Sequence, residues 1–299
     1  MKTYAVENGK RPLRAALICI LLGALTGGCA TMAPPPEDAE SADPRARVEQ
    51  ALANGDAAAR GGDRELAMFH YVRALMDDER SVPALLRIAT LHAADGKHEP
   101  AEQAYRRLLA VDERHAHGWE GLGLLMLHSS RQAQAGEYLR RAVELDPALW
   151  RAHNALGMIA DLQGHPQAAT DHYAAALALR PDEPQILNNL GYSKYLTREW
   201  PAAEAYFRAV LSRDPANPRA WSNMALLAAR QGHYDKALDA LKRVGTESQA
   251  YNNLGYLCLA NEQYTDAEYF LREAVRLSPT YYPAAQKNLE LLRARRFAN

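Results

Sequence analysis

The segment Trp119–Pro147 reads WEGLGLLMLHSSRQAQAGEYLRRAVELDP, and its pattern recurs along most of the chain. An alanine returns every 34 positions and once after a shorter step of 30, at Ala67, Ala101, Ala135, Ala169, Ala203, Ala237 and Ala267. Small residues at a fixed place let two helices approach to about 8–10 Å. Proline at the end of the unit, as at Pro147, cannot continue a helix. The pattern therefore predicts an all-α chain of consecutive helix pairs that stack as a solenoid.

This spacing resembles the tetratricopeptide repeat (TPR), in which each unit is a pair of antiparallel helices. The resemblance implies a right-handed superhelix of about seven helix pairs. We place the seven repeats at 48–81, 82–115, 116–149, 150–183, 184–217, 218–247 and 248–281. A capping helix and tail follow at 282–299. The sixth repeat is short, and we expect its second helix to end early at Gly245, because glycine is favoured just after a helix C-terminus.

The first 28 residues have the pattern of a signal peptide. A basic start is followed by the apolar stretch Ala15–Leu25, which is too short to span a bilayer. The following Thr26-Gly27-Gly28-Cys29 resembles a bacterial lipobox, although leucine is usual where Thr26 stands. The resemblance implies lipidation of Cys29 and, with Ala30 next to it, an outer-membrane lipoprotein on the periplasmic side of a Gram-negative bacterium. An ordinary secretory peptide cleaved nearby is the alternative.

Residues 29–47 are predicted to be a lipidated cysteine followed by a disordered tether. The run Pro34-Pro35-Pro36 and the acidic residues after it lack hydrophobic periodicity. Such a segment buries too little apolar surface to offset the entropy lost on ordering.

Composition and motifs argue against catalysis and nucleic-acid binding. The formal net charge of the 299 residues is −1, whereas nucleic-acid-binding domains are usually basic. The sequence has no phosphate-binding loop, zinc-protease motif, paired-cysteine site or nucleophile elbow. We therefore predict no enzymatic activity, no catalytic residue, no cofactor and no metal site. Asp161, His165 and His172 lie close in sequence, but histidines at repeat turns usually face solvent, and Cys258 is expected to be a buried apolar residue.

A binding face is predicted on the first helix of each pair, which lines the concave side of a TPR solenoid. The candidate residues are amides, aromatic rings and two cations, namely Asn154, Asn188, Asn189, Asn223, Asn252, Asn253, Tyr192, Tyr256, Arg151 and Arg219. Asparagine both donates and accepts hydrogen bonds, which suits the backbone of an extended peptide. Tyrosine adds amphipathic contact area. The alternative is that these asparagines hydrogen-bond to the neighbouring repeat and that the arginines are simply solvated.

One pentapeptide that occurs twice indicates a more specific resemblance. Asn-Asn-Leu-Gly-Tyr occurs at 188–192 and again at 252–256, after the shortened repeat. With Asn154-Ala155-Leu156-Gly157 and the lipobox, these resemble the TadD-like TPR lipoproteins of the tight-adherence (Tad/Flp) pilus system. The resemblance implies an outer-membrane assembly factor, similar to a pilotin, that binds protein components of a pilus or secretion machine. An envelope adaptor that recruits a protease or a peptidoglycan enzyme is the alternative, and a hydrolase is a further one.

Overall fold

The computed structural model describes residues 43–278 and 280–298. The predicted signal peptide, Cys29 and the tether up to residue 42 lie outside them. The described residues form 15 α-helices and no strand: α1 Pro44–Arg60, α2 Arg64–Asp77, α3 Val82–Ala94, α4 His98–Val111, α5 Ala116–His128, α6 Gln132–Leu145, α7 Trp150–Leu162, α8 Pro166–Leu179, α9 Pro184–Leu196, α10 Trp200–Arg213, α11 Pro218–Arg230, α12 Tyr234–Lys242, α13 Glu247–Ala260, α14 Tyr264–Leu277 and α15 Pro283–Ala298. In this part of the chain, no helix combines the length and apolarity that crossing a bilayer requires.

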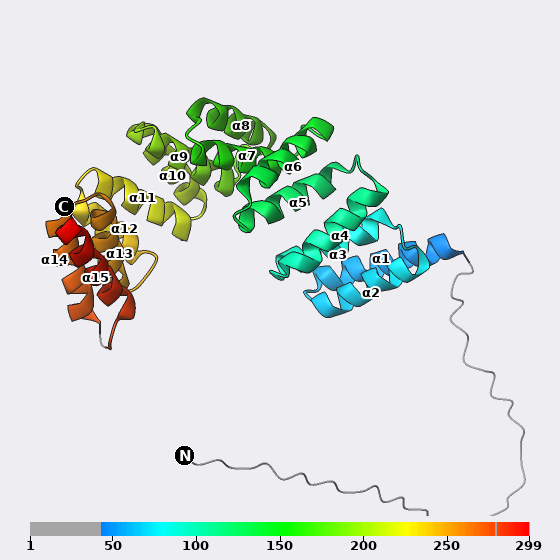
Figure 1. The fold of residues 1–299 in the computed structure, drawn as a ribbon, viewed down its shortest axis with the longest axis horizontal. Coiled ribbons are helices and arrows are strands. Elements are labelled where there is room, and N and C mark those ends of the chain that lie inside the picture. Colours follow the sequence, from blue (N-terminus) through cyan, green and yellow to red (C-terminus); the bar gives the residue numbers. More distant parts are fainter. Residues whose placement is uncertain (1–42, 279, 299) are drawn as a thin grey trace, which may run out of the picture. The chain divides into compact units, whose positions relative to one another are not determined.

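The helices pack in seven consecutive pairs followed by the capping helix α15 (Figure 1). This confirms the predicted all-α fold of paired helices. The first helix begins at Pro44, within the segment 29–47 that the sequence predicts to be a tether, so residues 44–47 are helical. Asp43 stabilises this start, because its side chain accepts a hydrogen bond from the Arg45 backbone N–H at 3.0 Å.

Close packing within a pair explains the spacing seen in the sequence. A Cβ atom added to Gly157 on α7 would lie 2.6 Å from Cε1 of Tyr173 on α8. Gly191 on α9 meets the ring of Phe207 on α10 at the same distance. Gly55, Gly123 and Gly255 make the same close approach, and the small Ala89 and Ala225 take this place on α3 and α11. A larger residue at Gly157 or Gly191 would force the pair apart.

The turn inside each pair has a residue in the left-handed backbone region. Glycine occupies this position four times, at Gly62, Gly96, Gly164 and Gly232, with φ between 71° and 82°. Three repeats place other residues there, with φ between 58° and 63°, at Ser130, Arg198 and Glu262. Because a Cβ atom disfavours this region, the three non-glycine turns are strained relative to the glycine turns.

The second helix of the short sixth repeat ends early, as predicted, because α12 has nine residues where α10 and α14 have 14. Helix α12 stops at Lys242, but Gly245 is not among the residues with positive φ, so it does not form a left-handed C-terminal cap. The next helix begins with a capping box. Thr246 accepts from the Gln249 backbone N–H, and the Gln249 side chain accepts from the Thr246 backbone N–H at 2.9 Å. The shortening therefore lies in α12, and the glycine does not cap its end.

The first helix of each pair contacts the first helix of the next pair. These contacts run from α3 to α5, α7, α9, α11 and α13, and then to the capping helix α15. In the described residues, the second helices make no comparable contact with one another. The first helices therefore lie on the inner side of the bend at each junction. We call the surface of α3, α5, α7, α9, α11 and α13 the first-helix face.

Buried apolar side chains form a core that is not continuous. One large cluster runs from Leu85 to Ile159, and another runs from Ala225 to Leu292. The repeats between them hold three smaller clusters, which contain Tyr173, Val210 and Phe207. Two further small clusters, which contain Ala51 and Tyr71, lie where the first repeat packs on α3. The two large clusters thus extend over α3–α7 and over α11–α15.

Candidate functional site

Asparagine side chains link consecutive first helices. Nδ2 of Asn189 on α9 donates to Oδ1 of Asn154 on α7 at 3.0 Å, and Nδ2 of Asn223 on α11 donates to Oδ1 of Asn188 at 3.4 Å. The sequence predicted these amides as candidates for peptide binding. The structure instead uses them between repeats.

Helix α13, the first helix of the seventh pair, is linked to the capping helix α15 in the same way. Oδ1 of Asn252 on α13 accepts from Nδ2 of Asn288 on α15 at 2.9 Å. Asn154, Asn188 and Asn252 expose only 3%, 2% and 7% of their surface. For these three residues the structure therefore favours the alternative interpretation, in which asparagine bonds to the neighbouring repeat. Buried amides need such partners, because an unpaired one costs about 1–3 kcal/mol.

The other predicted residues remain accessible on the first-helix face. Tyr192 and Tyr256 are 40% and 50% exposed. Asn253, which precedes Tyr256 by three residues on α13, is also exposed. The Tyr192 ring stacks on Tyr195, with ring centroids 5.8 Å apart. Stacking limits the motion of Tyr192 and leaves its outer face available for contact.

Leucines extend this accessible surface. Leu162 at the end of α7 and Leu196 at the end of α9 are 63% and 45% exposed, and they occupy equivalent places 34 residues apart. Neither leucine is among the residues predicted from the sequence. Both leucines are the last residues of their helices, a position that is usually exposed and polar. An apolar residue there is the sequence signal that could have identified them.

The two predicted cations differ in their surroundings. The Arg151 guanidinium lies over the Trp150 ring, 5.0 Å from its centroid, and its side chain is exposed. Arg219 is exposed in the first turn of α11. Both lie near the N-terminal ends of first helices, so they border the first-helix face.

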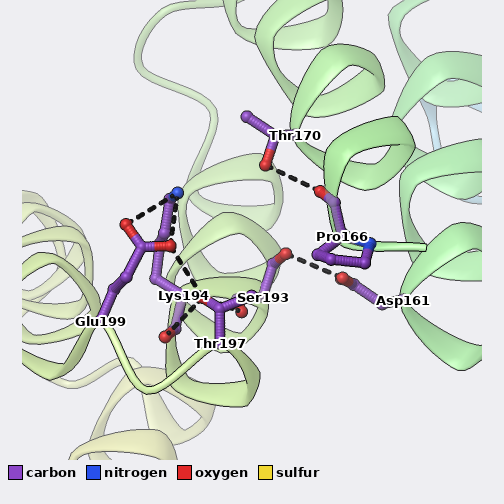
Figure 2. Close-up of polar contacts among 7 residues, drawn as sticks. All are labelled: Asp161, Pro166, Thr170, Ser193, Lys194, Thr197 and Glu199. Atoms are coloured by element: carbon purple, nitrogen blue, oxygen red, sulfur yellow. Dashed lines mark hydrogen bonds and ion pairs between the residues drawn. The ribbon is translucent and has the colours of Figure 1, made fainter. Parts of the chain in front are cut away.

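Asp161 belongs to a buried polar cluster that the sequence did not predict. It accepts from Ser193 Oγ at 2.8 Å and from the Tyr173 hydroxyl at 2.9 Å, and Figure 2 shows the bond to Ser193. Burial raises the pKa of Asp161, and the two hydrogen bonds offset part of that shift. The bonds of Asp161 thus join α7 to α8 and to α9. Figure 2 also shows Lys194, which pairs with Glu199 at 3.0 Å across the turn between α9 and α10.

The histidines near Asp161 in sequence do not join it. His172 on α8 instead lies beside His153 on α7, with their Nδ1 atoms 3.4 Å apart. Burial, followed by the neighbouring His153, lowers the pKa of His172. Among the described residues, no group of three histidine, cysteine or acidic side chains is arranged to hold a metal ion.

A groove of about 550 Å³ lies between second helices α10 and α12, above first helix α11. Trp221, Met224 and Leu227 contribute apolar surface to it, and Arg243 places its guanidinium 5.7 Å from the Trp221 ring centroid. Ala240 on α12 also lines the groove. At the equivalent position one other repeat also has an alanine, Ala104, whereas the rest have rings, at His70, Tyr138, His172, Tyr206 and Phe270. The small side chain of Ala240 therefore contributes to this space, but the residue type at this position does not by itself predict a groove.

Comparison with known families agrees with this geometry. Models described as tetratricopeptide repeat match residues 86–149, 137–184 and 154–218, then 197–254, and finally 248–281. Together the matches cover residues 86–281. No curated protein matches the chain in sequence.

Solved structures share the fold at low identity. A structure from a functional characterisation of Pseudomonas aeruginosa pilF is 23% identical, with a TM-score of 0.59 over 70% of this chain and 97% of that chain. A Parabacteroides merdae tetratricopeptide repeat protein is 15% identical, with a TM-score of 0.60 over 83% of this chain and 99% of that one. PilW, described as a widely conserved type IV pilus biogenesis factor, is 20% identical, with a TM-score of 0.58 over 76% and 98%.

These likenesses establish the fold, while the repeat matches cover most of the helical part of the chain. Paired helices, glycine-to-ring packing and 34-residue spacing are the features that such repeats share. The chain belongs to the tetratricopeptide-repeat family.

Proposed function

We propose that this protein is a lipid-anchored scaffold that holds a polypeptide segment of a pilus or secretion machine on its first-helix face. The lipid would be attached at Cys29 and would anchor the protein to the periplasmic side of the outer membrane. Tetratricopeptide repeats are protein-binding scaffolds and are usually non-catalytic. The assignment to a Tad/Flp-type pilus rests on the sequence resemblance. The fold that the chain shares with the pilus biogenesis factor PilW is compatible with it.

One observation carries the binding proposal. On the first helices in the described residues, the large apolar or aromatic side chains that remain exposed are Leu162, Tyr192, Leu196 and Tyr256. The asparagine links join α7 to α9 and α9 to α11, so α7 and α9, which carry three of these side chains, are held in register before a partner arrives. Pre-positioned aromatic rings provide contact area at a low entropic cost. A partner segment that lies across α7, α9 and α13 would contact these side chains.

Site-specific photo-cross-linking in cells tests this proposal. A photoreactive phenylalanine analogue replaces Tyr192 or Tyr256 in the full chain, and adducts are identified by mass spectrometry. Tyr269 on second helix α14 is the matched control, because it is 58% exposed and lies on the other helix of its pair. We expect adducts with a pilus or secretion component from positions 192 and 256 and none of them from position 269.

Other outcomes separate the alternatives. Adducts with a protease or a peptidoglycan enzyme from positions 192 and 256 would support the adaptor function instead. Equal adducts from position 269 would contradict binding at the first-helix face. Cys29→Ser tests the anchor separately: the variant should leave the outer-membrane fraction, and unchanged membrane partitioning and lipid labelling would show that Cys29 is not lipidated.

A further inference from the structure

Helix α2 has an apolar stripe on its outer surface. Leu66, Phe69, Val72 and Met76 are 44%, 61%, 44% and 76% exposed. Their spacing of three or four residues places them on one side of the helix. We call these four residues the α2 stripe. Exposed apolar residues that gather in this way mark a contact surface more often than isolated ones do.

The stripe is a property of the first repeat and not of second helices in general. Residues that occupy the place of Phe69 in the later second helices are Gln103, Glu137, Asp171, Ala205, Asp239 and Tyr269. Five of these six are polar or small. The repeat pattern therefore does not require an apolar side chain at this position. Contact with a surface outside the repeats would explain why Phe69 is apolar.

We propose that the α2 stripe lies against the lipid surface to which the protein is anchored. The inference rests on the anchor of the proposed function, because the stripe belongs to the repeat nearest to Cys29 in sequence. Only 14 residues separate Cys29 from Pro44, where α1 begins. A chain of that length reaches at most about 50 Å even when it is fully extended. The anchor therefore keeps the first repeat close to the membrane, where an amphipathic helix buries its apolar side about 5–10 Å into the headgroup region.

The charges around the stripe define what kind of lipid contact to expect. Residues 60–80 contain four arginines and five acidic residues, so the charges nearly cancel. Attraction to anionic lipids cannot then drive the contact, and apolar insertion must do so. The contact should persist on vesicles of zwitterionic lipid and should depend little on salt.

An environment-sensitive fluorophore in the lipidated full chain tests the inference. The label is attached at Met76→Cys, and the matched control is Ser212→Cys, the equivalent exposed position four repeats later on α10. Cys258 should not compete for the label, because it is fully buried and burial raises its pKa to about 12. Both proteins are reconstituted into vesicles of phosphatidylethanolamine and phosphatidylcholine, with and without lipids that carry a spin-label quencher.

We expect emission from position 76 to shift to shorter wavelength and to be quenched by the labelled lipids, and emission from position 212 to show neither effect. Phe69→Gln, which introduces the residue found at position 103, should remove the shift and the quenching while the protein stays on the vesicles. Because Phe69 is exposed, its replacement should leave the fold intact, and circular dichroism of the variant verifies this.

The remaining outcomes overturn the inference or the anchor separately. A label at position 76 that stays in water on vesicle-bound protein would refute lipid contact and leave the anchor intact. A label that is shielded but not quenched by lipid would assign the stripe to a protein surface, such as a second copy. Protein that does not partition with vesicles at all would refute the anchor itself.

Discussion

Replacing Asn154 with alanine tests whether the asparagine links stabilise the fold. Asn154 is 3% exposed, and its Oδ1 accepts a 3.0 Å hydrogen bond from Asn189. The substitution removes this bond and leaves the half-buried Asn189 amide without its partner. A neutral hydrogen bond contributes about 0.5–1.5 kcal/mol, and an unpaired buried group costs about 1–3 kcal/mol. Because Asn189 is only half buried, we expect Asn154→Ala to lower the free energy of unfolding by about 1–2 kcal/mol.

Urea unfolding followed by far-ultraviolet circular dichroism measures this change. Gln185→Ala on α9 is the control, because the exposed side chain of Gln185 should contribute less than about 0.5 kcal/mol. Asn189→Ala alone and combined with Asn154→Ala completes a double-mutant cycle. We expect the double variant to be more stable than the sum of the single effects predicts, because both substitutions remove the same bond. Equal losses for the Asn154 and Gln185 variants, or strictly additive losses in the cycle, would refute the reasoning.

Three further predictions concern the helix pairs. Arg198→Gly should raise the free energy of unfolding by about 0.5–1 kcal/mol, because it relieves a non-glycine residue at a φ of 63°; thermal melting would reveal this, and a lower melting temperature would contradict it. Gly157→Ala should destabilise by about 1–3 kcal/mol, since the new Cβ atom would meet Tyr173, whereas Gly136→Ala within α6 should stabilise by about 0.5–1 kcal/mol. The same urea titration compares the two, and equal effects would argue against the close approach at Gly157. Because the pKa of His172 is lowered, the unfolded chain binds more protons than the folded chain below about pH 6.5. The free energy of unfolding therefore decreases as the pH is lowered through that range. His172→Tyr should therefore lose less stability than the wild type between about pH 7.5 and pH 5.5, and an identical loss would show that the pair with His153 is not responsible.

The sequence predicted the helix pairs because their determinants are local and periodic. A small residue every 34 positions records close packing between two helices, and the structure confirms it at Gly157 and Gly191. The start of α13 was harder to predict. It depends on reciprocal bonds between Thr246 and Gln249, which carry less sequence signal than the nearby Gly245.

The candidate site was only partly predictable for a different reason. The same asparagine suits a peptide backbone or a neighbouring repeat, and the sequence does not show which group its amide meets. The structure resolves this for Asn154, Asn188 and Asn252, which are buried, while Tyr192 and Tyr256 remain exposed. The groove beside Ala240 is lined by residues of α10, α11 and α12, and no sequence motif marks a groove that several helices form together.

The divided core has a consequence for how this protein would come apart. In an array of repeats, stability is the sum of what each unit contributes and what each junction adds. The apolar clusters are small at the junctions α7–α9 and α9–α11, and asparagine bonds reinforce both junctions, as one also does between α13 and α15. Hydrogen exchange should therefore find lower opening energies in α8, α9 and α10 than in α5 or α13, so that a load applied between α5 and α13 would separate the repeats there first.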